Sequence, residues 1–177
     1  MTLPQLVLAA VLAAQSAVSP VAVTRVSTPE KALVFDVVVP APIATVWTAF
    51  TTRDGLQTWL WRDVRVALRP GGDWIVQFTP TATGGGTIES FTPERELVMR
   101  ALAPEQFPAV RATRTRVAFH FAPVGAGATR VTLIQTGWQT GAEWDAAYDY
   151  LASGNAQLLA QLHQRFTTGP IAWPAPR

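Results

Sequence analysis

The chain has 177 residues, of which 49% are hydrophobic and 15% are charged, a balance typical of one globular domain rather than a disordered chain. Its formal net charge is +2 and its arginines are spread along the sequence, which argues against a nucleic-acid-binding surface. Because cysteine is absent, disulfides, thiolate catalysis and cysteine-ligated metals are excluded, while the cellular compartment stays open.

The N-terminal residues indicate export. An apolar run at residues 6–14 precedes small residues at 15–19, as in the hydrophobic region and cleavage zone of a secretory signal peptide. The run is shorter than the about 20 residues of a membrane span, so no transmembrane segment is expected in the mature chain. We expect residues 1–19 to be a signal peptide and the mature protein to be periplasmic or secreted. An unprocessed N-terminus, with a cytoplasmic location, is the alternative, since no Lys or Arg precedes the run.

The next residues predict a linker, a strand and two short helices. Residues 20–30 contain two prolines and several Ser and Thr residues, which is typical of a linker. Residues 31–39 place apolar side chains at every second position and predict the first strand. Apolar residues at helical spacing then predict amphipathic helices over 43–50 and 54–60.

From residue 63 onward the period of the apolar residues changes to two, which predicts antiparallel strands. The turn-forming residues 70–73 separate the first two of them and indicate a hairpin. The expected strands cover residues 64–69, 74–78, 87–91, 96–102, 109–121 and 129–137, with loops at 81–86 and 103–108.

A long amphipathic helix is expected over residues 140–166. Thr140 and Glu143 have the spacing of a capping box, in which each side chain accepts a hydrogen bond from a free amide at the helix start. Gly169 and Pro170 predict its end, and residues 169–177 form a C-terminal tail. Its apolar stripe consists of Trp144, Tyr148, Leu151, Leu158, Leu159, Leu162 and Phe166. Such a helix needs a surface to cover, and the preceding strands predict that this surface is a sheet.

The order of these elements and several short motifs resemble a known family. The motifs are Pro42-Ile43 with Val46-Trp47-Thr48-Ala49-Phe50, Leu56 with Trp59, Pro70-Gly71-Gly72-Asp73-Trp74, Gly86-Thr87-Ile88-Glu89, Pro93-Glu94-Arg95-Glu96-Leu97-Val98 and Ala128-Thr129-Arg130-Val131-Thr132-Leu133. Over residues 31–166 they are similar to the family named after the activator of the heat-shock-protein-90 ATPase, within the START-like (SRPBCC) superfamily. The resemblance implies an α+β helix-grip domain at residues 31–168. In that fold, a curved antiparallel sheet of about six to seven strands surrounds one long C-terminal helix, and two short helices follow the first strand.

One position departs from the family pattern. Family members commonly carry Trp after the glycine of the final helix, whereas Asn155 follows Gly154 here. Asn155 lies on the stripe that should be buried, and a buried amide without partners costs about 1–3 kcal/mol. We therefore expect Asn155 to bond a neighbour or to face a cavity.

Standard catalytic and metal-binding signatures are missing from the sequence. There is no HExxH, GxSxG or P-loop motif, and His120 and His163 lack ligands at metal-binding spacing. The sequence therefore predicts no catalytic residue, no metal and no cofactor. Asp145 and Asp149 lie off the apolar stripe of the long helix and are expected to face water.

Aromatic residues dominate the candidate site. Their elements should converge between sheet and helix, and aromatic-lined cavities hold flat or apolar ligands. The predicted ligand-binding residues are Trp59, Trp74, Glu89, Trp138, Trp144, Tyr148 and Asn155. A filled core is the alternative for the aromatic residues. For Glu89 we favour an ion pair with an arginine such as Arg100 over a free buried acid.

Together these features predict an exported protein that binds an apolar or aromatic small molecule, or a lipid, between the sheet and the long helix. No nucleic-acid partner is expected, and the sequence identifies no protein partner. One alternative is a cofactor-independent enzyme like the cyclases and aromatases of the same superfamily, in which cavity side chains orient the substrate. A second alternative, which follows the family name, is a co-chaperone-like interaction module.

Overall fold

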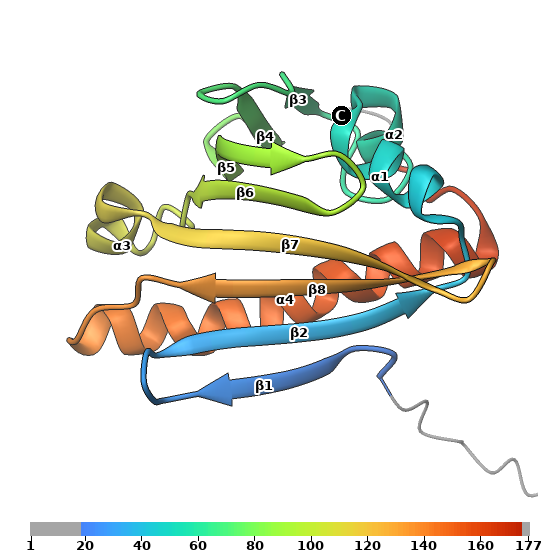
Figure 1. Ribbon diagram of the computed structural model, residues 1–177. Coiled ribbons are helices and arrows are strands. Elements are labelled where there is room, and N and C mark those ends of the chain that lie inside the picture. Colours follow the sequence, from blue (N-terminus) through green and yellow to red (C-terminus); the bar gives the residue numbers. More distant parts are fainter. Residues whose placement is uncertain (1–18, 175–177) are drawn as a thin grey trace, which may run out of the picture.

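The computed structural model describes residues 19–174 (Figure 1). The expected signal peptide lies outside these residues, apart from Ser19. In chain order the elements are β1 (Ala22–Val26), β2 (Ala32–Val39), α1 (Ile43–Thr51), α2 (Arg53–Gln57), β3 (Val64–Val66), β4 (Asp73–Thr79), β5 (Ala82–Thr92), β6 (Glu96–Ala101), α3 (Pro108–Thr113), β7 (Thr115–Val124), β8 (Ala128–Thr136) and α4 (Ala142–Thr168).

All strands belong to one antiparallel sheet with the order β1-β2-β8-β7-β6-β5-β4-β3. β2 pairs with β8, so the first strand of the expected domain lies beside the last one. α4 crosses one face of the sheet, and α1 and α2 lie near the C-terminal end of α4 (Figure 1). The predicted α+β architecture, with a long C-terminal helix on an antiparallel sheet, is therefore confirmed.

The core lies between the sheet and the helices. Every second residue of β2 is buried, with Leu33, Phe35 and Val39 at 0% exposure. From the other side, Leu159 and Leu162 of α4 are also fully buried. The expected period of two in the strands and of 3.6 in the helix thus places both apolar faces in one core.

The sheet has one strand that the sequence did not reveal. β1 lies within residues 20–30, which were expected to be only a linker, and it brings the strand number to eight instead of six to seven. Its residues are mostly exposed, so they show no apolar alternation. Pairing with β2 and an ion pair between Arg25 and Asp149 (2.5 Å) hold it at the sheet edge.

The region before β7 also differs from the prediction. Residues 108–113 form α3 rather than the beginning of a strand, because Pro108 starts a helix and Glu143 accepts hydrogen bonds from the amides of Ala109 (2.7 Å) and Val110 (3.2 Å). The predicted capping box is therefore wrong. Gly141 is the N-cap of α4, and the Glu143 carboxylate caps α3 instead.

The glycine-rich segment is a strand rather than a loop. β5 begins at Ala82 and includes Gly84, Gly85 and Gly86. A Cβ atom at Gly85 would lie 2.0 Å from the carbonyl oxygen of Trp74, and one at Gly86 would lie 2.4 Å from that of Arg100. Only glycine allows the neighbouring strands to approach this closely.

The expected C-terminal tail follows the end of α4 at Gly169, which has a positive φ of 102°. Its described part, up to Pro174, lies along the end of α2 and the residues that follow it. The amide of Ile171 donates to Thr58 O (2.9 Å), and the indole of Trp173 donates to Gln57 O (2.6 Å). The ring of Trp173 also contacts that of Trp61 at 4.9 Å between centroids. These contacts hold the tail against the domain.

We predict that Leu162→Ala lowers the free energy of unfolding by about 2–5 kcal/mol, because Leu162 is fully buried between α4 and the sheet. Leu151→Ala should cost less, since Leu151 is only partly buried. Urea denaturation followed by circular dichroism measures both values. Equal losses for the two variants, or an unchanged midpoint for Leu162→Ala, would contradict this packing.

Candidate functional site

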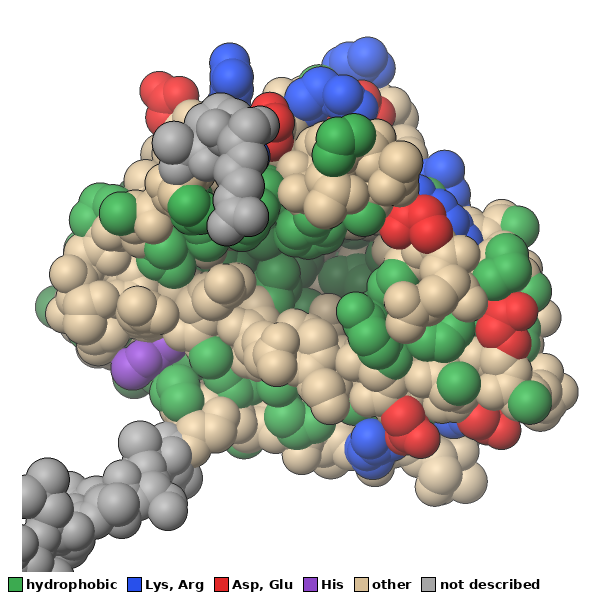
Figure 2. All heavy atoms as spheres, turned by 180° about the vertical axis from the view of Figure 1, so that it is seen from behind, with side chains coloured by type: hydrophobic (Ala, Val, Ile, Leu, Met, Phe, Trp, Pro, Cys, Tyr) green, Lys and Arg blue, Asp and Glu red, His purple; other side chains and the backbone are tan. Residues whose placement is uncertain are grey.

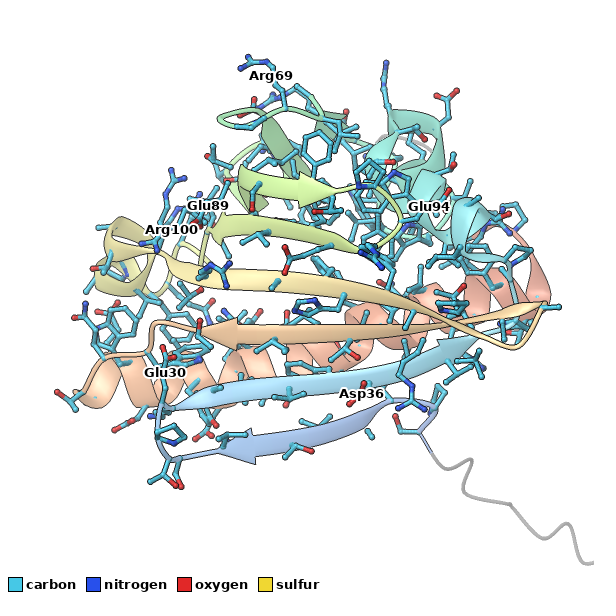
Figure 3. All side chains as sticks on the ribbon, in the orientation of Figure 1. Glu30, Asp36, Arg69, Glu89, Glu94 and Arg100 are labelled. Carbon is cyan, nitrogen blue, oxygen red and sulfur yellow. The ribbon has the colours of Figure 1, made fainter. Side chains whose placement is uncertain are left out.

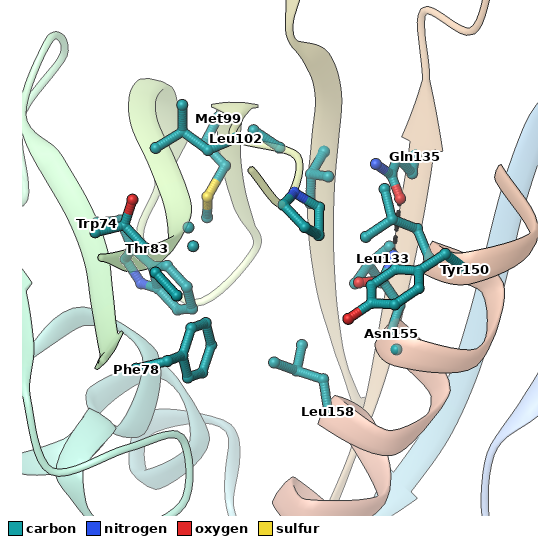
Figure 4. A pocket seen from close by; sticks show the side chains of 18 of the residues that line it. Trp74, Phe78, Thr83, Met99, Leu102, Leu133, Gln135, Tyr150, Asn155 and Leu158 are labelled. Carbon is teal, nitrogen blue, oxygen red and sulfur yellow. Dashed lines mark hydrogen bonds between the residues drawn. The ribbon is translucent and has the colours of Figure 1, made fainter. Parts of the chain in front are cut away.

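A cavity of about 450 Å³ lies between the sheet and the middle of α4. Figure 2 shows it as a hollow with an apolar interior, and Figure 4 shows the side chains around it. Its volume falls within the range of small-molecule sites in proteins. We call it the sheet–helix cavity. Its lining includes Trp74, Phe78, Met99, Val117, Phe119, Leu133, Gln135, Tyr150, Leu151, Asn155 and Leu158, together with residues 82–85, 101–102 and 104–106.

Glycines keep two walls of the cavity open. Gly154 lies in the middle of α4, and a Cβ atom built there would meet no atom within 4 Å. On the opposite wall, Gly84 and Gly85 of β5 also line the space without side chains. Because glycine within a helix costs about 1 kcal/mol relative to alanine, Gly154 lowers helix stability at the position where the helix borders the cavity.

A line of hydrogen-bonded side chains enters the cavity from β7 and β8. Gln135, which is 2% exposed, donates from Nε2 to Thr115 Oγ1 (2.8 Å) and accepts at Oε1 from Asn155 Nδ2 (2.8 Å; Figure 4). This network satisfies the buried amide of Gln135. Asn155 uses one N–H group in it and retains a carbonyl oxygen that can accept a hydrogen bond from a ligand. The expectation that Asn155 bonds a neighbour beside a cavity is confirmed on both points.

The rim of the cavity contains a charged cluster. Glu105 Oε1 accepts hydrogen bonds from the amide (2.8 Å) and hydroxyl (3.2 Å) of Thr83, and it lies 3.1 Å from Nη2 of Arg111. The hydrogen bond from the Thr83 amide, together with the charge of Arg111, lowers the pKa of Glu105 below its ordinary value. This cluster ties the β4–β5 hairpin to the connection between β6 and α3.

Few charged groups line the cavity. Among the residues of the described chain that line it, Glu105 carries the single carboxylate, and no lysine, arginine or histidine is present. Because its pKa is lowered, Glu105 is ionised near neutral pH and its oxygen is occupied by Thr83 and Arg111. It is thus a poor general acid, and its position at the rim gives it a structural role.

Two of the seven predicted site residues, Trp74 and Asn155, line the cavity. The indole of Trp59 is fully buried and donates to Ala49 O (2.9 Å), and the hydroxyl of Tyr148 donates to Ala32 O (2.9 Å). These two side chains are part of the filled core.

The other three predicted residues also lie elsewhere. Trp144 packs in a separate cluster with Phe107 and Val110. Trp138 is partly buried against this cluster, and its indole donates to Gln135 O (3.0 Å). Glu89 is exposed on the side of β5 opposite the buried Ile88 (Figure 3). It does form an ion pair, but with Arg116 at 3.7 Å instead of Arg100.

Sequence reasoning missed most of the residues that surround the cavity. Gln135 had a usable signal, because it is a long polar side chain at an inward position of a strand whose other inward residues include Val131 and Leu133. Tyr150 lies off the main apolar stripe of α4, and Glu105 lies in a loop, so neither had a pattern that pointed to a site. Asp145 and Asp149 are exposed as expected, and each also pairs with a basic residue at the sheet edge, Lys31 and Arg25 respectively.

Residues 19–174 contain neither a membrane-spanning helix nor a metal-binding cluster of side chains. No helix in this part of the chain is long and apolar enough to cross a membrane. Within the same residues, no group of three or more His, Asp or Glu side chains could hold a metal ion.

Comparison with known proteins shows which family has this sequence pattern. Residues 40–167 match the sequence model of the family described as Activator of Hsp90 ATPase homolog 1-like protein. A comparison with curated protein sequences gave no match.

Solved structures with the same fold include three informative examples. The Aha1 dimer from Colwellia psychrerythraea is 18% identical, with a TM-score of 0.64 over 78% of this chain and 97% of that one. CalU16 from Micromonospora echinospora is 21% identical, with a TM-score of 0.62 over 86% and 85%. DynU16, a protein of the dynemicin biosynthetic locus, is 19% identical, with a TM-score of 0.63 over 80% and 49%. At these identities the likeness concerns the fold.

We predict that Glu105→Gln destabilises the protein more at pH 7 than at pH 3. A carboxylate whose folded pKa is lowered stabilises the fold above its unfolded pKa, and this contribution is lost as the pH falls through the folded pKa. Urea denaturation of wild type and variant at both pH values measures the difference. Glu89→Gln, at an exposed carboxylate, serves as the control. A difference that is the same at both pH values would show that the Glu105 charge does not stabilise the rim.

Proposed function

We propose that this chain, which belongs to the family of Activator of Hsp90 ATPase homolog 1-like proteins, binds an apolar small molecule in the sheet–helix cavity. The observation that carries the proposal is the open wall at Gly154. Beside it, the cavity presents Leu133, Leu158 and Phe119, a surface that gains from contact with an apolar ligand. Asn155 supplies a directional hydrogen bond next to this surface.

An enzyme of the cyclase or aromatase type is the second candidate. It is supported by the line from Thr115 through Gln135 to Asn155, which could hold a polar group of a substrate in one orientation. DynU16, with the same fold, comes from a biosynthetic locus. The engagement of Glu105 by Thr83 and Arg111 favours binding without acid–base chemistry. A co-chaperone-like role rests on the family description and on the fold shared with the Aha1 dimer.

We predict that Gly154→Leu weakens binding of the neutral fluorescent probe N-phenyl-1-naphthylamine by at least about tenfold, because the new side chain fills the open space. The wild type should bind the probe with increased fluorescence. Ser153→Leu is the matched control, since Ser153 is the neighbouring exposed position of α4 and lies outside the cavity lining. If the wild type does not bind the probe, or if both variants bind it equally well, the proposed site is wrong.

We further propose that the protein acts outside the cytoplasm. Support comes from the apolar run at residues 6–14 and the small residues that follow it. The expected result is a mature protein that begins near residue 20, as measured by mass spectrometry of the protein from its native host. A cytoplasmic protein that retains Met1 would contradict export, and it would make the co-chaperone role the better hypothesis.

A further inference from the structure

A second hollow of about 620 Å³ adjoins the sheet–helix cavity. The two share Phe78, Tyr150, Gly154 and Leu158, so the cavity continues outward past these residues along α4. The rest of the lining of the second hollow includes Leu60, Ala160 and three glutamines, Gln157, Gln161 and Gln164. We call it the glutamine groove.

The three glutamines form one row. Their spacing of four and three residues places them on the same face of α4, next to Gly154 and Tyr150. Each side-chain amide offers two donors and one acceptor oxygen without a net charge. The groove is therefore uncharged, and a larger share of its lining is polar than in the inner cavity, although apolar surface predominates in both.

Charge selects among the classes of ligand that could occupy this combined site. Within residues 19–174, neither hollow is lined by a basic side chain, and the single acidic lining residue, Glu105, is paired with Arg111. A carboxylate or an ammonium group placed in the inner cavity would lose hydration without gaining an opposite charge, which is costly. Hydroxyl or amide groups would instead exchange hydrogen bonds with the glutamines.

The mouth between the two hollows is itself apolar. Phe78 and Tyr150 are 42% and 49% exposed, although large aromatic side chains are usually covered. Figure 4 shows both rings at the cavity, Phe78 from the hairpin side and Tyr150 from α4. A ligand that extends from the cavity into the groove would pass between them and cover their exposed surface.

From these observations we propose that the ligand is an uncharged amphiphile. Its apolar part fills the sheet–helix cavity, and its hydroxyl- or amide-bearing end lies against the glutamine row. This inference rests on the proposed function, because it assigns the ligand class for the same cavity.

The test compares three compounds with the same twelve-carbon chain: 1-monolaurin, laurate and dodecyltrimethylammonium. Each is titrated below its micellar concentration against the wild type loaded with N-phenyl-1-naphthylamine. We expect 1-monolaurin to displace the probe at a concentration at least about tenfold lower than either charged compound. Equal or better displacement by laurate or by the cation overturns the inference but leaves the binding function intact. Failure of the probe to bind overturns both.

A charge substitution tests the location of the polar end. Gln161→Arg should increase the affinity for laurate about tenfold and leave the probe affinity unchanged, because the new cation lies in the groove and outside the inner cavity. Thr167→Arg adds the same charge at an exposed position of α4 outside both hollows and should have little effect. If both variants increase laurate affinity equally, or if neither does, the polar end does not lie at Gln161.

Discussion

A straight helix can contact a curved sheet over only part of its width, and the sheet–helix cavity follows from this constraint. α4 has 27 residues and is about 40 Å long. It packs on β2 and β1 at one side of the sheet, where Phe35 and Leu159 are fully buried. Irregular pairing occurs on the other side, in β4–β5 near Gln77 and in β5–β6 near Ile88. Such irregularities bend strands, and the space between these strands and α4 is the cavity.

The residues at this gap do not close it. Gly154 on the helix and Gly84 and Gly85 on the sheet leave the space open, although bulkier residues at the two sheet positions would also clash with neighbouring atoms. The buried amide of Gln135 at the gap is satisfied by Thr115 and Asn155. An opening of this kind is stable because its walls are held by the surrounding core rather than by contacts across it.

The rim shows how distant segments stabilise one another. Glu143 belongs to the first turn of α4 but caps α3, and Glu105 in the preceding connection holds Thr83 of the β4–β5 hairpin. The starts of α3 and β5 therefore depend on carboxylates from segments distant in the sequence. Since the hairpin forms one wall of the cavity, the hydrogen bonds of Glu105 and its ion pair with Arg111 also hold this wall in place.

Local patterns allowed much of the fold to be predicted. The period of two in β2 and β8 indicates which face of each strand is apolar, and the apolar stripe does the same for α4. Each pattern can be read from a few neighbouring residues. β1 was not predicted because an exposed edge strand has no such pattern. α3 was not predicted because the carboxylate that caps it belongs to Glu143, 34 residues away from Ala109 in the sequence.

The composition of the site was determined only by tertiary structure. The sequence by itself identified an aromatic-rich interior and an unusual amide at Asn155. It did not distinguish Trp74, which lines the cavity, from Trp59, which is packed in the core, since both are apolar residues on inward faces. That distinction depends on tertiary placement. Trp59 follows α2 and packs on α1, where its indole donates to Ala49 O (2.9 Å), whereas Trp74 lies on β4 beside the gap between the sheet and α4. The local sequence thus predicts which residues are buried, whereas the location of an unfilled space depends on how all the elements pack together.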